Sequence, residues 1–249
     1  MSRRLPATGS SDAGDAGARL RAPPGARGAA RPARVLELWV SERAVRSEVW
    51  LGDLERPRVQ TKLERDLSEA AGTRDHQGVV AWCEPFRYAD AFELAARPAP
   101  LLACLDQVSD PRNLGAVIRS AEGAGASGVV VPAHGSARVT AAVCRSSAGA
   151  VEHLPVAVVP NLARYLAEIK RGDLWVAGAV GGSGTPMWEA DLSGGVAFVF
   201  GAEGKGLRPL VRRTCDVEVS IPQLGRVESL NVSVAAALLL YEARRQRDG

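Results

Sequence analysis

The sequence contains few residues of the kinds that build metal centres or disulfide frameworks. Its 249 residues include four cysteines and three histidines. The cysteines are far apart along the chain and form no CxxC pair: Cys83, Cys104, Cys144 and Cys215. A structural zinc site is therefore not expected, and reduced thiols in a cytoplasmic protein are the simpler interpretation.

Long apolar runs are also absent. No uninterrupted apolar stretch is long enough to span a bilayer, so we expect no membrane helix. Residues 1–34 contain arginines and small residues but lack the apolar core that a secretory signal needs. The formal net charge is only +3, which by itself does not identify a nucleic-acid-binding protein.

Several common catalytic patterns are missing as well. No GxGxxG follows a first strand with an acidic residue downstream, which makes a nicotinamide-dependent enzyme a remote interpretation. No serine–histidine–acid set and no pair of carboxylates stands out. Because no metal-ligand cluster stands out either, we expect no metal cofactor.

Composition and periodicity divide the chain into four segments. Residues 1–34 are rich in Gly, Ala, Pro and Arg without periodicity and are predicted to be disordered. Residues 35–82 are predicted to form a small α/β unit, and residues 83–100 a linker. Over residues 101–246, short apolar strands alternate with helices. This alternation predicts an α/β fold with a mostly parallel sheet that binds ligands at the carboxyl ends of its strands.

The first candidate site is the helix predicted in "DPRNLGAVIRSAEGAG", residues 110–125, where an Asp-Pro pair suits the N-cap and the first helical position. Four residues share one apolar arc: Leu114, Val117, Ile118 and Ala121. The opposite arc places Arg112 and Arg119 two turns apart, beside small residues that would let another backbone approach. Asn113 lies in the first turn, where exposed N–H groups favour an anion. The alternative is an amphipathic helix whose arginines face water, with Arg119 paired to Glu122.

The second candidate site is "FVFGAEGKGL", residues 198–207. A buried strand runs into three glycines, Gly201, Gly204 and Gly206, around Glu203. Their order is neither that of GxGxxG nor that of a P-loop. Glycines directly after a parallel strand indicate a backbone that turns tightly or touches a ligand, and a plain strand-to-helix turn is the alternative.

The third candidate site is "SIPQLGRVESLNVSVAAALLLYEA", residues 220–243. Residues 230–240 are nearly apolar all round, which predicts a buried helix. Ser229, Asn231 and Ser233 lie at its start. Because buried amides and hydroxyls need partners, these side chains either fix neighbouring loops or hold a ligand. Alternatively, Ser229 simply caps the helix.

In their order and spacing, the three motifs resemble those of the SpoU/TrmH branch of the SPOUT RNA ribose 2′-O-methyltransferases. The resemblance covers about residues 101–246, and the combination of three motifs is highly specific. Upstream, "LELWVSE" and "DHQGVVA" resemble the small substrate-binding domain of bacterial members that methylate a guanosine ribose in 23S rRNA. The stretch "RLRAPPGARGAARPAR" replaces the strand and helix that usually begin that domain, so an incomplete or unusual start is expected.

The resemblance implies a C-terminal trefoil knot, S-adenosylmethionine as the cofactor, an RNA substrate and a homodimer. Gly201, Ile221 and Leu230 would contact the cofactor, largely through backbone groups. The family's catalytic and structural polar positions match five residues here: Asn113, Arg119, Glu203, Ser229 and Asn231. Arg112 is expected to approach an RNA phosphate. Arg119 is a persistent cation that hardly deprotonates, so it would stabilise the developing alkoxide while a substrate phosphate or water takes the proton.

Three functions stay open at this point. The leading hypothesis is methylation of a ribose 2′-hydroxyl in rRNA, and the upstream domain favours it over the same chemistry on tRNA. A non-catalytic RNA-binding protein of the same fold is a different class of function. The presence of Asn113, Arg119, Glu203 and Asn231 argues against that class.

Overall fold

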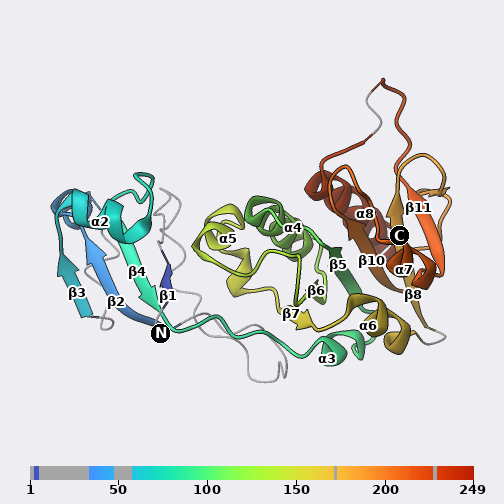
Figure 1. The fold of residues 1–249 in the computed structure, drawn as a ribbon, viewed down its shortest axis with the longest axis horizontal. Helices are drawn as coiled ribbons and strands as arrows, with labels where there is room; N and C mark the ends of the chain where they lie inside the picture. Colours follow the sequence, from blue (N-terminus) through green and yellow to red (C-terminus); the bar gives the residue numbers. More distant parts are fainter. Residues whose placement is uncertain (1–2, 6–33, 48–57, 171–172, 227–228) are drawn as a thin grey trace. The chain divides into compact units, whose positions relative to one another are not determined.

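The structure of the chain is a computed structural model, drawn as a ribbon in Figure 1. The residues that it describes are 3–5, 34–47, 58–170, 173–226 and 229–249. They form two compact units, one up to residue 87 and the other from residue 88 onward. Within these ranges, no helix is both long and apolar enough to cross a membrane.

The first unit contains a four-stranded mixed sheet with the strand order β1-β4-β2-β3. Its elements are β1 (Arg3–Leu5), β2 (Val35–Val40), α1 (Glu42–Ser47), β3 (Arg58–Thr61), α2 (Glu64–Ala71) and β4 (Val79–Cys83). Strand β4 runs antiparallel to β1 and β2, whereas β2 and β3 are parallel. Helix α2 buries Leu67 and Ala70 against Val80 of β4, which gives this unit a small core of its own.

Two strands of this unit differ from the sequence-based expectation. Strand β1 falls inside the segment 1–34 that composition predicts to be disordered, and residues 6–33 of that segment lie outside the described residues. Strand β3 has the polar sequence RVQT and lies at the edge of the sheet with most of its residues exposed. An exposed edge strand carries no apolar alternation, which is the signal on which strand prediction depends.

The second unit is built on a seven-stranded sheet with the order β7-β6-β5-β10-β8-β11-β9. The strands are β5 (Leu101–Asp106), β6 (Gly128–Pro132), β7 (Val156–Val159), β8 (Leu174–Val180), β9 (Thr185–Pro186), β10 (Gly195–Gly201) and β11 (Val217–Ser220). Every pair of neighbouring strands is parallel. The predicted α/β fold with a mostly parallel sheet is therefore confirmed.

Helices cover both faces of this sheet (Figure 1). They are α3 (Ala91–Ala95), α4 (Pro111–Gly123), α5 (Ala141–Ser146), the 3₁₀ helix η3 (Ala150–Glu152), α6 (Leu162–Ile169), α7 (Pro209–Thr214) and α8 (Val232–Asp248). On one face, α3, α6 and α7 share a core with the sheet, represented by Leu94, Leu166 and Val211. On the other face, α4 contacts both α5 and α8. Because both faces are covered, every residue of β5 is buried.

Helix α3 lies within the segment 83–100 that the sequence predicts to be a linker. Asp90 caps it by accepting hydrogen bonds from Phe92 N (2.7 Å) and Glu93 N (3.2 Å). The Tyr165 hydroxyl of α6 donates to Ala91 O at 2.8 Å and ties the helix to the core. Helix α3 has only five residues, too few for a periodic apolar signal, and prolines follow it closely. The sequence pattern therefore did not reveal it.

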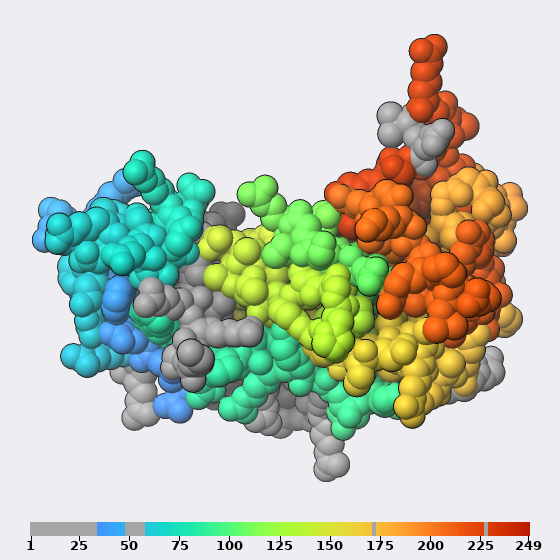
Figure 2. Space-filling model, viewed as in Figure 1, coloured from blue at the N-terminus to red at the C-terminus, as the bar shows by residue number. Residues whose placement is uncertain are grey.

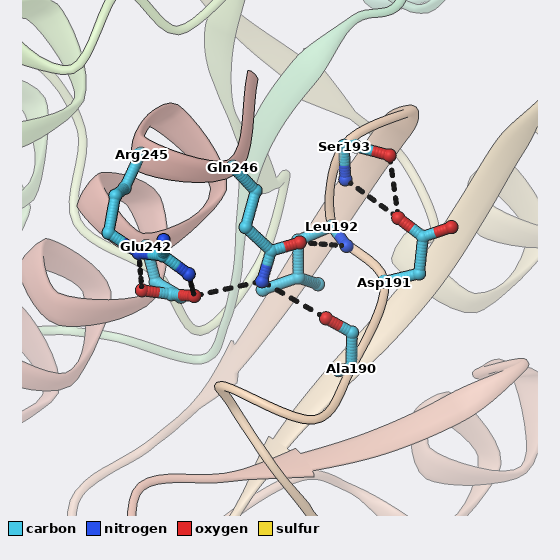
Figure 3. Close-up of polar contacts among 7 residues, drawn as sticks. All are labelled: Ala190, Asp191, Leu192, Ser193, Glu242, Arg245 and Gln246. Atoms are coloured by element: carbon cyan, nitrogen blue, oxygen red, sulfur yellow. Dashed lines mark hydrogen bonds and ion pairs between the residues drawn. The ribbon is translucent and has the colours of Figure 1, made fainter. Parts of the chain in front are cut away.

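The last turns of α8 hold the connection that precedes β10 (Figure 3). Gln246 Nε2 donates to Ala190 O (3.1 Å) and to Glu242 Oε1 (2.8 Å), while its Oε1 accepts from Leu192 N (2.8 Å). Glu242 also accepts from Arg245 Nε (2.9 Å) and Nη2 (2.8 Å). Hydrogen bonds from Arg245 and Gln246 lower the pKa of Glu242 to about 2. This network fixes α8 to the loop in front of the central strand.

Candidate active site

The three sequence motifs meet at one edge of the parallel sheet. Strand β5 ends at Asp106, β10 at Gly201 and β11 at Ser220. Helix α4 follows β5, residues 201–208 follow β10, and residues 221–231 follow β11. Because the strands are parallel, these three segments all leave the sheet from its carboxyl edge, where open α/β sheets bind ligands.

Helix α4 begins as its sequence predicts. Asp110 caps it by accepting a hydrogen bond from Arg112 N at 2.8 Å, and Pro111 occupies the first position. The predicted apolar arc is buried: Leu114, Val117, Ile118 and Ala121. The helix is thereby fixed against the sheet with its N-terminal turn at the carboxyl edge.

Residues 201–208, here called the glycine loop, turn back on themselves. Gly206 N donates to Ala202 O at 2.9 Å, and the two residues form an isolated antiparallel bridge. Gly204 and Gly206 have φ values of 72° and 64°, in the left-handed region that favours glycine. A Cβ at Gly201 would overlap the backbone of Gly206. The segment therefore turns tightly between β10 and α7, one of the two roles that its glycines indicate.

The three motifs join through one cluster of polar side chains. Asn113 Nδ2 of α4 donates to Glu203 Oε1 of the glycine loop at 3.0 Å. Asn231 Nδ2, just before α8, donates to the same Glu203 oxygen at 2.6 Å and to Asn113 Oδ1 at 3.1 Å. Asn113 is 90 positions from Glu203 and 118 positions from Asn231 along the chain. The structure thus brings together three of the five residues that the sequence singles out as polar site positions.

Asn231 also caps α8, which corrects one sequence-based alternative. Its Oδ1 accepts from Ser233 N (2.9 Å) and from the Ser233 hydroxyl (2.6 Å). Ser229 does not cap the helix, because α8 begins at Val232 and Ser229 lies outside its first turn. The Asn231 side chain suits the cap position because its oxygen accepts from the first turn of α8 while its nitrogen donates to the Glu203 carboxylate.

A cavity of about 720 Å³ lies beside this cluster, at the ends of β8, β10 and β11. All three residues expected to contact a cofactor line it, namely Gly201, Ile221 and Leu230. Three of the polar residues line it as well: Glu203, Ser229 and Asn231. Beyond Ile221 the segment 222–226 projects from the surface of this unit (Figure 2), and Leu224 on it is fully exposed.

Arg112 and Arg119 both lie exposed on α4. Neither side chain has a hydrogen bond or ion pair with another residue of the described ranges. The alternative pair between Arg119 and Glu122 does not form, although both arginines do face solvent. Since neither cation has a partner among the described residues, both arginines remain available for an anionic ligand.

The small residues of α4 admit neighbours from this same chain. A Cβ at Gly115 would lie 2.9 Å from Ser147 N and would overlap the Ser146 side chain of α5. A Cβ at Gly123 would lie 2.7 Å from the Tyr241 hydroxyl of α8. These glycines were predicted to let another backbone approach, and the backbone that approaches Gly115 is that of Ser147, the residue directly after α5.

Asp106 and Arg208 form a contact that sequence reasoning missed. Asp106 is completely buried at the end of β5, and its Oδ1 accepts from Arg208 Nε at 2.7 Å. Its Oδ2 accepts from Arg208 N at 2.9 Å. The only sequence signal is an aspartate that ends the otherwise apolar strand "LLACLD".

Two thiols of this unit, those of Cys104 and Cys215, are poorly suited to nucleophilic chemistry. Burial raises the pKa of Cys104 well above its ordinary range and raises the pKa of Cys215 to about 11. Both thiols are therefore protonated at neutral pH. Within the described ranges, no group of three or more His, Cys, Asp or Glu side chains is placed to hold a metal ion.

Comparison with known proteins gives a consistent result. The model of the SpoU rRNA Methylase family matches residues 100–241. The 23S rRNA (guanosine-2'-O-)-methyltransferase RlmB of Shewanella oneidensis is 41% identical over 226 residues, or 87% of this chain and 91% of that relative. The enzyme of the same name from Ralstonia nicotianae is 46% identical over 184 residues, or 73% of this chain and 74% of that relative.

A solved structure of similar fold carries a ligand. The SpoU methyltransferase AviRb from Streptomyces viridochromogenes, in complex with the cofactor AdoMet, has a TM-score of 0.74 and 29% sequence identity to this chain. The match covers 87% of this chain and 84% of AviRb, so it extends over both units described above.

Proposed function

The chain belongs to the SpoU rRNA methylase family, and from this premise we propose that it transfers a methyl group from S-adenosylmethionine to a ribose 2′-hydroxyl of RNA. The substrate that we propose is a guanosine of 23S rRNA. Relatives named for that reaction match this chain along most of its length, including the first unit. The same chemistry on tRNA is the second candidate.

The observation that carries this proposal is the meeting of the three motifs beside one cavity. Asn113, Glu203 and Asn231 come from separate parts of the chain and share hydrogen bonds of 2.6–3.1 Å. These side chains are partly or largely exposed and could bond to water instead, so the network depends on the fold bringing the three motifs together. A non-catalytic RNA-binding protein would not need one beside a ligand cavity.

The cavity suits S-adenosylmethionine in its chemistry. Its walls combine apolar side chains such as Phe200, Val219 and Leu239 with backbone groups at the ends of strands, a mixture that fits a ligand with an aromatic base and polar ends. We propose that Gly201, Ile221 and Leu230 hold the cofactor, largely through their backbone groups. When bound, the cofactor supplies the electrophilic methyl group.

The remaining residues would act on the ribose and the RNA. Methyl transfer to a hydroxyl is an in-line displacement, so it needs positioning of the oxygen and stabilisation of its developing charge. Arg119 offers directional donors and a permanent positive charge for that oxygen, and a substrate phosphate or water takes the proton. Arg112 would contact an RNA phosphate. Asn113 bonds to Glu203 and Asn231, which supports the proposal that it is held at the start of α4 to contact the ribose.

The test is to map ribose methylation on 23S rRNA from cells that lack this protein. We expect one guanosine to lose its 2′-O-methyl group and to regain it with the wild-type gene but not with Arg119→Ala. Arg164→Ala is the matched control, because Arg164 is an exposed arginine on α6 that pairs only with Glu168, at 2.7 Å. Unchanged rRNA with a changed tRNA would favour the second candidate, and full methylation by Arg119→Ala would contradict the role of Arg119.

We further propose that the protein is a homodimer that uses one face of α8. Val234, Leu238 and Tyr241 are spaced i, i+4 and i+7 on that helix and are 46%, 39% and 51% exposed. A stripe of apolar side chains on one helix suits a two-fold contact with a second copy. Light scattering is expected to give a dimer for the wild type and a monomer for Leu238→Glu. The control Leu210→Glu, on α7, should stay dimeric, since Leu210 is exposed elsewhere.

Two properties implied by the family resemblance stay predictions. One is the trefoil knot formed by the C-terminal segment. The other is the place of action, which we expect to be the cytoplasm because its widely spaced, unpaired cysteines suit a reducing compartment.

A further inference from the structure

The glycine loop is anchored at two points that have different chemistry. At its tip, the Glu203 carboxylate accepts hydrogen bonds from Asn113 and Asn231. At its base, Arg208 is held by Asp106, which takes no part in the mechanism above. Asp106 stands in register with Gly201, so it lies next to the first residue of the loop as well as the last.

The anchor at the base is strong because the carboxylate is buried. Asp106 is 0% exposed, and each of its oxygens accepts one bond from Arg208, at 2.7 Å from Nε and 2.9 Å from the backbone N. A buried carboxylate needs both a counter-charge and hydrogen-bond donors, and Arg208 supplies both. Only the carboxylate depends fully on this contact: the Arg208 side chain is 43% exposed and keeps contact with water, whereas loss of the arginine would leave the buried Asp106 without a counter-charge.

Five residues of the glycine loop form a wall of the cavity: Gly201, Ala202, Glu203, Gly204 and Gly206. Neither Asp106 nor Arg208 lines the cavity. Their influence on a bound ligand must therefore pass through the backbone of the loop.

We infer that Asp106 is a positioning residue that, by holding Arg208, sets the glycine loop for binding of S-adenosylmethionine. The inference rests on the proposed function. The role is distinct from general stabilisation, because the segment that Asp106 holds is the one that carries Glu203 and the cavity wall. Loss of the contact between Asp106 and Arg208, here called the clasp, therefore weakens binding of the cofactor more than it weakens binding of RNA.

The experiment is to measure S-adenosylmethionine binding by calorimetry for the full-length protein and for Asp106→Asn. The asparagine keeps the shape of the side chain but turns an N–H donor toward one of the two donors of Arg208. We expect the Kd for S-adenosylmethionine to rise about tenfold, the size of one lost charge-assisted hydrogen bond. The KM for S-adenosylmethionine should rise with it, while the KM for RNA stays within about twofold of the wild type.

Asp216→Asn is the matched control. Asp216 has the same bonding pattern, with Oδ1 accepting from Lys170 Nζ at 2.6 Å and Oδ2 from Val176 N at 2.9 Å, but it does not touch the cavity or the glycine loop. Both variants should lower the thermal unfolding temperature, and only Asp106→Asn should weaken cofactor binding. Equal Kd values for Asp106→Asn and the wild type, or equal losses for both variants, would overturn the inference.

A second set of variants tests the coupling between the two anchors. Glu203→Gln combined with Asp106→Asn should raise the Kd by less than the product of the single effects, because both act on one loop. Asp106→Asn combined with Asp216→Asn should show no such coupling. If Asp106→Asn fails to fold, Arg208→Gln removes the charge and the Nε donor while the backbone bond to Asp106 stays, and a Kd equal to that of the wild type would then refute the inference. A wild-type protein that does not bind S-adenosylmethionine would instead refute the proposed function.

Discussion

Replacing Asn231 with alanine removes two kinds of contact at once. Its Oδ1 caps α8 through Ser233 N, and its Nδ2 donates to Glu203 and Asn113. Asn161 gives a matched comparison, because it caps α6 by accepting from Arg164 N at 3.1 Å and has no second task in the site. The difference between the two alanine variants isolates the contribution of the polar cluster.

The expected magnitudes follow from the bonds that each variant loses. A capping side chain contributes about 1 kcal/mol to stability. For Asn231, the hydrogen bonds to Glu203 and Asn113 lie between exposed side chains, where water competes, and each adds about 0.5 kcal/mol. Asn231→Ala should therefore lower the free energy of unfolding by about 2 kcal/mol, and Asn161→Ala by about 1 kcal/mol.

The assay is urea unfolding of both variants, followed by calorimetric titration with S-adenosylmethionine. Only Asn231→Ala should weaken cofactor binding, since Asn231 and Glu203 line the cavity and Asn161 does not. Equal losses of stability, together with an unchanged Kd for Asn231→Ala, would refute the reasoning. In that case the cluster would be a surface feature of little energetic weight.

Two further predictions concern the glycine loop and the end of α8. Gly201→Ala should weaken S-adenosylmethionine binding at least about tenfold, because a Cβ there overlaps the Gly206 backbone and forces the loop to move; Gly194→Ala, in open space, should bind normally. Glu242 has its pKa lowered from 4.5 to about 2, chiefly by Arg245, so its stabilising contribution is complete above pH 4.5 and is lost as the pH falls toward 2. The difference in thermal stability between the wild type and Glu242→Gln should shrink over that range, and a constant difference would contradict this assignment.

Much of the second unit could be predicted because its signals are local. Helix α4 has an Asp-Pro start and a regular apolar arc, and β5 is an uninterrupted apolar run. The elements that were missed carry weak local signals. Strand β9 has only two residues, and α3 lies among prolines in a segment predicted to be a linker. Such elements form because tertiary contacts fix them, which a single sequence does not display.

The site was predictable as a set of residues but not as a set of contacts. Asn113, Glu203 and Asn231 stand out by their types and by the resemblance, yet the bonds among them cross up to 118 positions. The clasp between Asp106 and Arg208 spans 102 positions and leaves no periodic trace. A helix cap was one of two interpretations of Ser229, because a pattern fixes the start of a helix only to within a few residues. The structure shows that the cap is Asn231.

The arrangement of the cavity walls has a consequence for the order of folding. The walls come from β8, β10, β11 and α8, and α8 contributes Val232, Ala235 and Leu239. The central pairing of β5 with β10 already requires a long excursion of the chain, and the cavity closes only after α8 has been made and docked. Cofactor binding should thus appear in the growing chain only after α8 has been synthesised and has docked on the sheet. An enzyme that modifies ribosomal RNA would remain inactive until that helix is in place.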